Sequence, residues 1–176
     1  MEFVMTLRIR KEKRDDYPII TEVLSLAFGR KNEGHLVERL RVNPSFLPEL
    51  SIVAEIESSI IGHILFFPVS IVSGNVRLPS LALAPISVVP DYQGRGVGKE
   101  LIEYGLKRSA ELGSKSVIVL GHAAYYPRFG FRPASKWYIK APFEVPDDAF
   151  LAMELVKNGL KDVSGTVEYP KEFDDV

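Results

Sequence analysis

The sequence predicts a single α+β domain built on a mixed, mostly antiparallel sheet flanked by helices. Strand-like runs joined by short turns fill much of the first half of the chain, and one strand–helix–strand crossover follows. No repeat or long linker divides the 176 residues, a length that suits one domain with its own core. We place the domain over residues 1–176, with a core at about 6–156 and a C-terminal extension at 157–176.

The chain opens with a predicted strand and two predicted helices. Residues 6–11 (TLRIRK) alternate apolar and charged side chains, as a half-buried strand does. In 16–28, apolar residues recur at helical spacing; the aspartates before them suit a helix start, and Gly29 suits its end. A shorter helix is predicted at 32–41, with its apolar residues on one side.

Three strands are predicted next. The β-rich runs 51–57 and 60–72 are joined at Ser58–Ser59, which predicts a hairpin. We expect His63 to lie on the polar side of that hairpin. A third extended run, 77–90, ends at Pro90.

The C-terminal half contains the crossover. A long helix at 96–112 carries an apolar face, and KSVIVL (115–120) reads as a buried strand. The remaining elements are predicted to be short: a helical turn at 123–129, late strands at 131–140 and 150–156, and one further candidate strand at 165–169.

Composition excludes several functional classes. Lysine plus arginine (22) nearly balance aspartate plus glutamate (23), so neither a nucleic-acid footprint nor a membrane-surface patch is predicted. The chain has no cysteine, which excludes disulfides and a cysteine nucleophile and fits a cytoplasmic protein. No apolar stretch reaches the roughly 20 residues that span a bilayer, and the N-terminus lacks the order of a signal peptide. Met5 is an alternative start to Met1.

A glycine-rich loop, PDYQGRGVGK (90–99), lies between a predicted strand and the start of the long helix. The first turn of a helix has unpaired N–H groups, and the helix dipole favours negative charge there. Glycines let oxygens approach these nitrogens closely, while Arg95 and Lys99 add cationic donors. The loop is therefore suited to hold phosphate groups.

Two common phosphate-binding motifs do not fit this loop. A P-loop would require glycine where the chain has Gln93, and serine or threonine where it has Glu100. The dinucleotide fingerprint G-x-G-x-x-G fails as well, because its third glycine would fall on Lys99 or Leu101.

The motif that does fit is Q-x-x-G-x-G, at Gln93–Gly98, after ISVVPDY. It closely resembles the coenzyme A pyrophosphate loop of the GCN5-related N-acetyltransferase (GNAT) superfamily. The predicted order of elements also resembles that fold over most of the chain. A second family signature, Tyr-x-x-x-Gly-Phe, is matched within YYPRFGF (125–131) by Tyr126, Gly130 and Phe131. Within the superfamily, GHAAYYPRFGF and SGTVEYPKEF resemble small bacterial and archaeal acetyltransferases whose substrates are mostly unassigned.

The resemblance implies an N-acetyltransferase that uses acetyl-CoA as co-substrate and an amine, on a small molecule or a peptide, as acceptor. Without a cysteine, direct attack of the amine on the thioester in a ternary complex is the simpler mechanism. The backbone N–H of Val88 corresponds to the donor that binds the thioester carbonyl, and Tyr126 to the general acid that protonates the departing thiolate. The residues implied in coenzyme binding are Ile86, Ser87, Val88, Gln93, Gly94, Arg95, Gly96, Val97, Gly98 and Lys99.

The base that accepts the amine proton stays open. Glu33, on the second predicted helix, and His122, after the fifth predicted strand, are the candidates; a solvated glutamate and a structural histidine are the alternatives. Many relatives carry a coenzyme-contacting asparagine before the tyrosine helix, and here Gly121–Ala124 has none. No histidine pair lies at metal-ligand spacing with a carboxylate, so no metal is predicted. We expect the second helix and segment 132–150 to form the acceptor rim, the latter with Trp137, Tyr138, Phe143, Asp147 and Asp148.

Other functional classes compete with this assignment. A coenzyme-A-binding regulatory module would share the loop but show no turnover. A scaffold domain, in which QGRGVG is only a helix-capping turn, would have no coenzyme affinity. An enzyme that prefers a longer acyl group is a third reading, and a homodimer is the assembly common among relatives.

Overall fold

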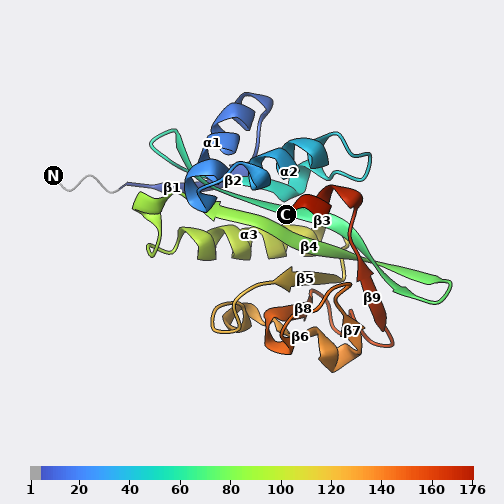
Figure 1. The fold of residues 1–176 in the computed structure, drawn as a ribbon. Helices are drawn as coiled ribbons and strands as arrows, with labels where there is room; N and C mark the ends of the chain where they lie inside the picture. The colour runs from blue at the N-terminus through green and yellow to red at the C-terminus, as the bar shows by residue number, and fades with distance from the viewer. Residues whose placement is uncertain (1–4) are drawn as a thin grey trace.

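In a computed structural model that describes residues 5–176, the strands form one nine-stranded sheet (Figure 1). Met1, the first of the two candidate starts, lies outside the described residues. The strand order is β1-β2-β3-β4-β5-β8-β6, and β9 pairs with both β3 and β7. The strands are β1 (Leu7–Lys11), β2 (Ser51–Ile56), β3 (Ser59–Ser73), β4 (Val76–Val88), β5 (Ser116–Leu120), β6 (Arg132–Pro133), β7 (Ile139–Lys140), β8 (Phe150–Glu154) and β9 (Gly165–Glu168).

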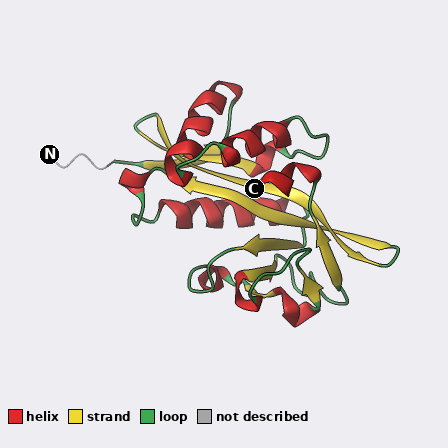
Figure 2. Ribbon diagram, in the orientation of Figure 1, coloured by secondary structure: helices red, strands yellow, loops and turns green. Residues whose placement is uncertain are grey.

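The sheet is mixed and mostly antiparallel, which confirms the predicted α+β class. Among the strands within residues 5–176, only β4–β5 and β7–β9 pair in parallel. Helices α1 (Tyr17–Phe28) and α2 (Asn32–Arg41) pack on one face with their own apolar core, and α3 (Val97–Glu111) packs on the other (Figures 1 and 2). A third core joins β5 and β8 to β9, so the candidate strand of the C-terminal extension is a sheet member.

Most predicted elements form close to the expected residues, with differences at three places. The first hairpin turns one residue earlier than expected, at Glu57 and Ser58, which both have positive φ (48° and 67°). The predicted late strand at 131–140 is wrong: a 3-10 helix, Ala134–Trp137, separates the two-residue strands β6 and β7. Its residues turn because they cover the third core, where Ala134 is buried and Trp137 partly buried, rather than extending an edge.

The expectation for His63 is also wrong. Its side chain is fully buried, because helices cover both faces of β3 at this point and leave the strand no solvent-exposed side. The sequence pattern of a half-exposed hairpin therefore does not apply to this strand.

The position of the glycine loop is set by close packing of α3 on the sheet. A Cβ at Gly105, in the middle of α3, would overlap the ring of Phe66 on β3. This glycine allows the helix to approach the sheet, and the helix N-terminus then lies beside the end of β4 (Figure 1). Among the described residues, none of the helices has the length and apolar character needed to cross a bilayer.

Candidate active site

The glycine loop presents main-chain N–H groups that the protein leaves unused. A 3-10 helix, Pro90–Tyr92, follows β4, and the Gln93 amide still donates to the carbonyl of Pro90 (3.2 Å). From Gly94 to Lys99, no backbone N–H donates to any other group within residues 5–176; the next, that of Glu100, donates to Gly96 (3.1 Å). These free amides lie at the N-terminus of a 15-residue helix, where an anion is favoured.

The loop glycines are required by backbone conformation rather than by lack of room. Gly94 and Gly96 have φ of +73° and +83°, in the left-handed region that side-chain-bearing residues rarely adopt. A Cβ built at either position would meet nothing within 4 Å. A side chain at either position would therefore strain the loop backbone.

Gln93 and the loop cations have different roles in the structure. The Gln93 side-chain amide donates to the carbonyl of Val88 (2.9 Å) and so ties the loop to the end of β4. Arg95 lies over the ring of Tyr92, 5.3 Å from its centroid, and Lys99 pairs with Glu103 (3.1 Å). Gln93 therefore shapes the loop, while both cations lie on its exposed side.

Strands β4 and β5 diverge just before the loop. Their parallel pairing covers only Leu81–Val117 and Ala82–Ile118, after which β4 pairs with β3 alone. The Val89 N–H donates to Ile61 on β3 (2.8 Å), and N–H groups alternate in direction along a strand. The N–H groups of Val88 and Ile86 therefore point away from β3, toward the opening that β5 leaves.

A cavity of about 1110 Å³ occupies this opening. From β4 it is lined by Leu83, Ala84, Pro85 and Ile86, and from β5 by Ile118 and Leu120. Glu33 and Leu36 line it from α2, and the end of β9 and the C-terminal 3-10 helix (Lys171–Asp175) close another side. The volume and the mainly apolar wall are typical of a small-molecule site.

The adjacent tyrosines lie in different surroundings. Tyr126 lines the cavity, is 7% exposed and packs edge-on against Phe131 (5.7 Å between centroids). The hydroxyl of Tyr125 instead lies near the loop, 3.4 Å from where a Cβ of Gly98 would be. Burial raises the pKa of Tyr126 to about 12, so its hydroxyl keeps its proton at neutral pH.

Both candidate bases lie on the cavity wall, with different partners. Glu33 is 3% exposed and accepts hydrogen bonds from the guanidinium of Arg30, including one of 2.9 Å from Nε. His122 is exposed at the end of β5, and its ring makes no hydrogen bond with a described residue. Of the expected rim, Phe143 lines the cavity, whereas Trp137, Tyr138, Asp147 and Asp148 do not.

Sequence reasoning missed several wall residues. Gly121 is one of them: a Cβ there would overlap the Tyr126 ring, so this glycine fixes the position of the tyrosine. Tyr169 and Phe173, in the C-terminal extension, are others. The resemblance in SGTVEYPKEF was a signal for this segment, but nothing in it indicated which cavity it would face.

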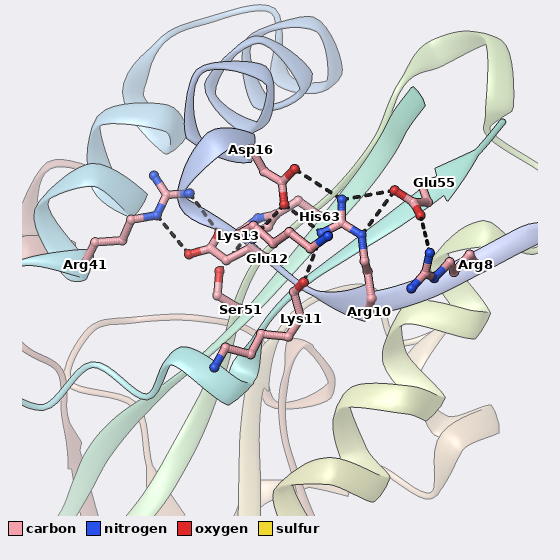
Figure 3. Close-up of polar contacts among 10 residues, drawn as sticks. All are labelled: Arg8, Arg10, Lys11, Glu12, Lys13, Asp16, Arg41, Ser51, Glu55 and His63. Carbon is pink, nitrogen blue, oxygen red and sulfur yellow. Dashed lines mark hydrogen bonds and ion pairs between the residues drawn. The ribbon is translucent and has the colours of Figure 1, made fainter. Parts of the chain in front are cut away.

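A second concentration of charge lies outside the cavity, between β1, β2, β3 and the first helices (Figure 3). We call it the buried polar cluster; its members are Arg10, Glu12, Asp16, Arg41, Ser51, Glu55 and His63. Within residues 5–176, no three His, Cys, Asp or Glu side chains are grouped so as to hold a metal ion.

A strand pair that opens beside a free-amide loop at a helix start is the arrangement of the acyltransferase class that the sequence resembles. The comparisons with known proteins agree. The model of the acetyltransferase (GNAT) domain matches residues 8–134, and the chain therefore belongs to the GNAT family.

The relative and the solved structures cover between 77% and 99% of the chain. The uncharacterized N-acetyltransferase YjhQ of Escherichia coli (strain K12) is 41% identical over 138 residues, covering 77% of this chain and 75% of YjhQ. The crystal structure of the E. coli GNAT family N-acetyltransferase YhbS in complex with CoA has a TM-score of 0.91 at 30% identity, covering 99% of this chain and 95% of that one. A GNAT family acetyltransferase from Brucella melitensis, solved with acetyl-CoA, has a TM-score of 0.79 at 32% identity, covering 97% and 99%.

Proposed function

We propose that the protein transfers an acetyl group from acetyl-CoA to a primary amine by direct attack within a ternary complex. The observation that carries this proposal is the set of free amides from Gly94 to Lys99 at the start of α3. They are placed to bind the diphosphate of the coenzyme, with Arg95 and Lys99 alongside. The bound CoA of YhbS and the bound acetyl-CoA of the Brucella protein support the same choice of ligand.

The pantetheine arm would follow the opened edge of β4 into the cavity. Ile86, Ser87 and Val88 form that edge, and the N–H of Val88 faces the opening. We assign this N–H as the donor to the thioester carbonyl, with the N–H of Ile86 on the same edge nearer the cavity. A main-chain donor fixed by a strand needs no reorganisation when the carbonyl oxygen gains charge.

In the transfer step, the amine nitrogen bonds to the carbonyl carbon, the carbon–sulfur bond breaks, and the sulfur takes up a proton. Tyr126 is our proton donor because it lines the cavity and holds its proton at neutral pH. The amine loses one proton to a base. Glu33 is already paired with Arg30. We therefore favour His122 as the base, because its ring has no partner among the described residues.

Thiol release from acetyl-CoA in the presence of amines tests the function. The chain contains no cysteine, so a thiol reagent reports CoA release without a background from the protein. We expect amine-dependent release and an N-acetylated product by mass spectrometry. Coenzyme binding without amine-dependent release across a broad panel would instead favour the regulatory module, and no coenzyme binding would favour the scaffold.

A further inference from the structure

The cavity wall away from β4 is aromatic. It includes Phe28 at the end of α1, Phe143, Tyr169 after β9, and Phe173. Phe143 stacks on Tyr169 (6.3 Å between centroids, 26°), and Tyr169 contacts Phe173 (5.4 Å). These rings come from segments far apart in the sequence. The C-terminal 3-10 helix, which carries Phe173, packs against α2 (Figure 1). Such a wall favours an apolar group on the acceptor.

The ionised side chains on this wall are all acidic. Glu33, Glu168 and Asp174 line the cavity, and no lysine or arginine among the described residues does. The cations that pair with the two glutamates, Arg30 and Arg77, are each 54% exposed and lie outside the wall. Asp174 has no hydrogen-bond or ion-pair partner within residues 5–176.

The charge on this wall that no cation among the described residues balances is therefore that of Asp174, because Glu33 and Glu168 are each paired with an arginine. Glu33 is 3% exposed, whereas Asp174 is exposed at the cavity edge and both partners of the Arg77–Glu168 pair are exposed (54% and 56%) and screened by solvent. A cation entering this space is attracted, and an anion is repelled and also loses its hydration.

We propose that the acceptor is a primary ammonium compound with an aromatic or similarly apolar body and no carboxylate near the amine. This proposal rests on the proposed function and narrows its acceptor class. Asp174 acts as a specificity-determining residue that attracts the ammonium group, and the rings of Phe143 and Tyr169 contact the body. Amino acids and other anionic amines are disfavoured because their carboxylate would lie beside Glu33 or Asp174.

Matched acceptors test the class directly. We would compare 2-phenylethylamine with L-phenylalanine, which adds a carboxylate to the same body, and with methylamine, which lacks the body. The expected kcat/KM for 2-phenylethylamine exceeds both of the others by about tenfold or more. Equal or better use of L-phenylalanine or methylamine would overturn the proposal.

A carboxylate substitution tests the residue assignment. In D174N, the KM for 2-phenylethylamine should rise several-fold while kcat stays near that of the parent. The ratio of kcat/KM for 2-phenylethylamine to that for L-phenylalanine should fall. D175N is the matched control, because Asp175 is, like Asp174, an exposed carboxylate on the same 3-10 helix, but it does not line the cavity. Equal effects of the two substitutions, or none in D174N, would contradict the role given to Asp174.

A binding measurement separates this proposal from the proposed function. With CoA present at saturation, 2-phenylethylamine should raise the melting temperature of the protein and L-phenylalanine should not, whether or not turnover occurs. If CoA itself gives no shift, the proposed function fails. If CoA binds but 2-phenylethylamine neither raises the melting temperature nor is acetylated, the acceptor proposal is overturned.

Discussion

The buried polar cluster and the candidate active site treat polar groups in opposite ways. In the cluster, each charge has an opposite charge beside it: Glu12 pairs with Arg41 through contacts of 3.1 and 2.9 Å, and Arg10 bridges Asp16 and Glu55 (Figure 3). At the active site, the loop amides have no partner among residues 5–176. The same chain thus pairs its charges where they join elements together and leaves main-chain donors free where a ligand can bind.

The cluster joins β1, β2 and β3 to the first helices and lies outside the cavity. Ser51 Oγ lies 2.9 Å from Nε2 of His63, and Glu12 Oε2 lies 3.6 Å from the same nitrogen. All three side chains are buried, however, and none lines the cavity. Nδ1 of His63 has no hydrogen-bond partner among the described residues. A Ser–His–carboxylate trio alone therefore does not define a reactive site.

The largest effect we expect comes from breaking the central pair of the cluster. In E12Q, Arg41 (side chain 7% exposed) loses its charged partner, and a buried ion left unpaired destabilises by about 3–5 kcal/mol. Urea unfolding should show this loss, while the dissociation constant for acetyl-CoA stays unchanged in the folded protein. E111Q, which breaks an exposed pair with Arg108, should change stability by less than about 1 kcal/mol.

Substitution at the cavity should affect turnover rather than stability. Y126F removes the proposed proton donor, so turnover should fall by about a hundredfold or more while coenzyme affinity stays near that of the parent. Y125F is the control, because its hydroxyl faces the loop and its loss should leave kcat within a few-fold. If Y126F turns over at the parent rate, Tyr126 is not the acid.

Strain in the loop should give a smaller effect, confined to binding. In G96V, a side chain is forced into the left-handed region at φ +83°, which costs about 1–2 kcal/mol and displaces the free amides. Coenzyme affinity should fall by about tenfold in a calorimetric titration. G113V, at φ +91° just beyond the other end of α3, introduces comparable strain away from the loop. Equal loss of affinity in both variants would show that the loop amides are not the cause.

The pH dependence of the cluster should be the mildest effect near neutrality. Burial lowers the pKa of His63 below its usual value of 6.5, so the ring is neutral in the folded protein at neutral pH. The unfolded chain takes up this proton more readily, and the free energy of unfolding therefore declines as the pH falls below 6.5. One proton changes stability by at most about 1.4 kcal/mol per pH unit. Unfolding free energies measured from pH 8 to 5 should decline; an increase would contradict the assignment.

Glu12 extends this decline at lower pH. Burial alone would raise its pKa, but the nearby His63 ring and the hydrogen bonds from Arg41 outweigh burial and lower it to about 2. The stability that comes from its charge is present above pH 4.5 and is lost as the pH falls toward 2. E12Q should remove this part of the acid sensitivity.

Local signals in the sequence were sufficient for most of the fold and for the loop. Helical spacing, Gly29 and the QGRGVG motif each depend on neighbours in sequence, and Gly29 does end α1 in the left-handed conformation. The resemblance to the GNAT superfamily is confirmed by the family match over residues 8–134. Local reasoning failed at His63 and Ala134–Trp137, where packing against distant elements decides burial and conformation.

The cavity could not be predicted because it depends on pairings far apart in the sequence. The divergence of β4 and β5 follows from a register that ends at Ala82–Ile118. The aromatic wall requires β9 to pair with β3, which brings Tyr169 and Phe173 to Glu33. Sequence could name Glu33, His122 and Tyr126 as candidates, but could not show that they line the same cavity.

The central claim is that the amides from Gly94 to Lys99 bind the diphosphate of the coenzyme. A melting-temperature titration with acetyl-CoA, set against S-acetylpantetheine, which has the thioester but no diphosphate, tests it most directly. The account predicts a dose-dependent rise with acetyl-CoA and little or none with S-acetylpantetheine at the same concentrations. No rise at millimolar acetyl-CoA, or an equal rise with both compounds, would contradict it.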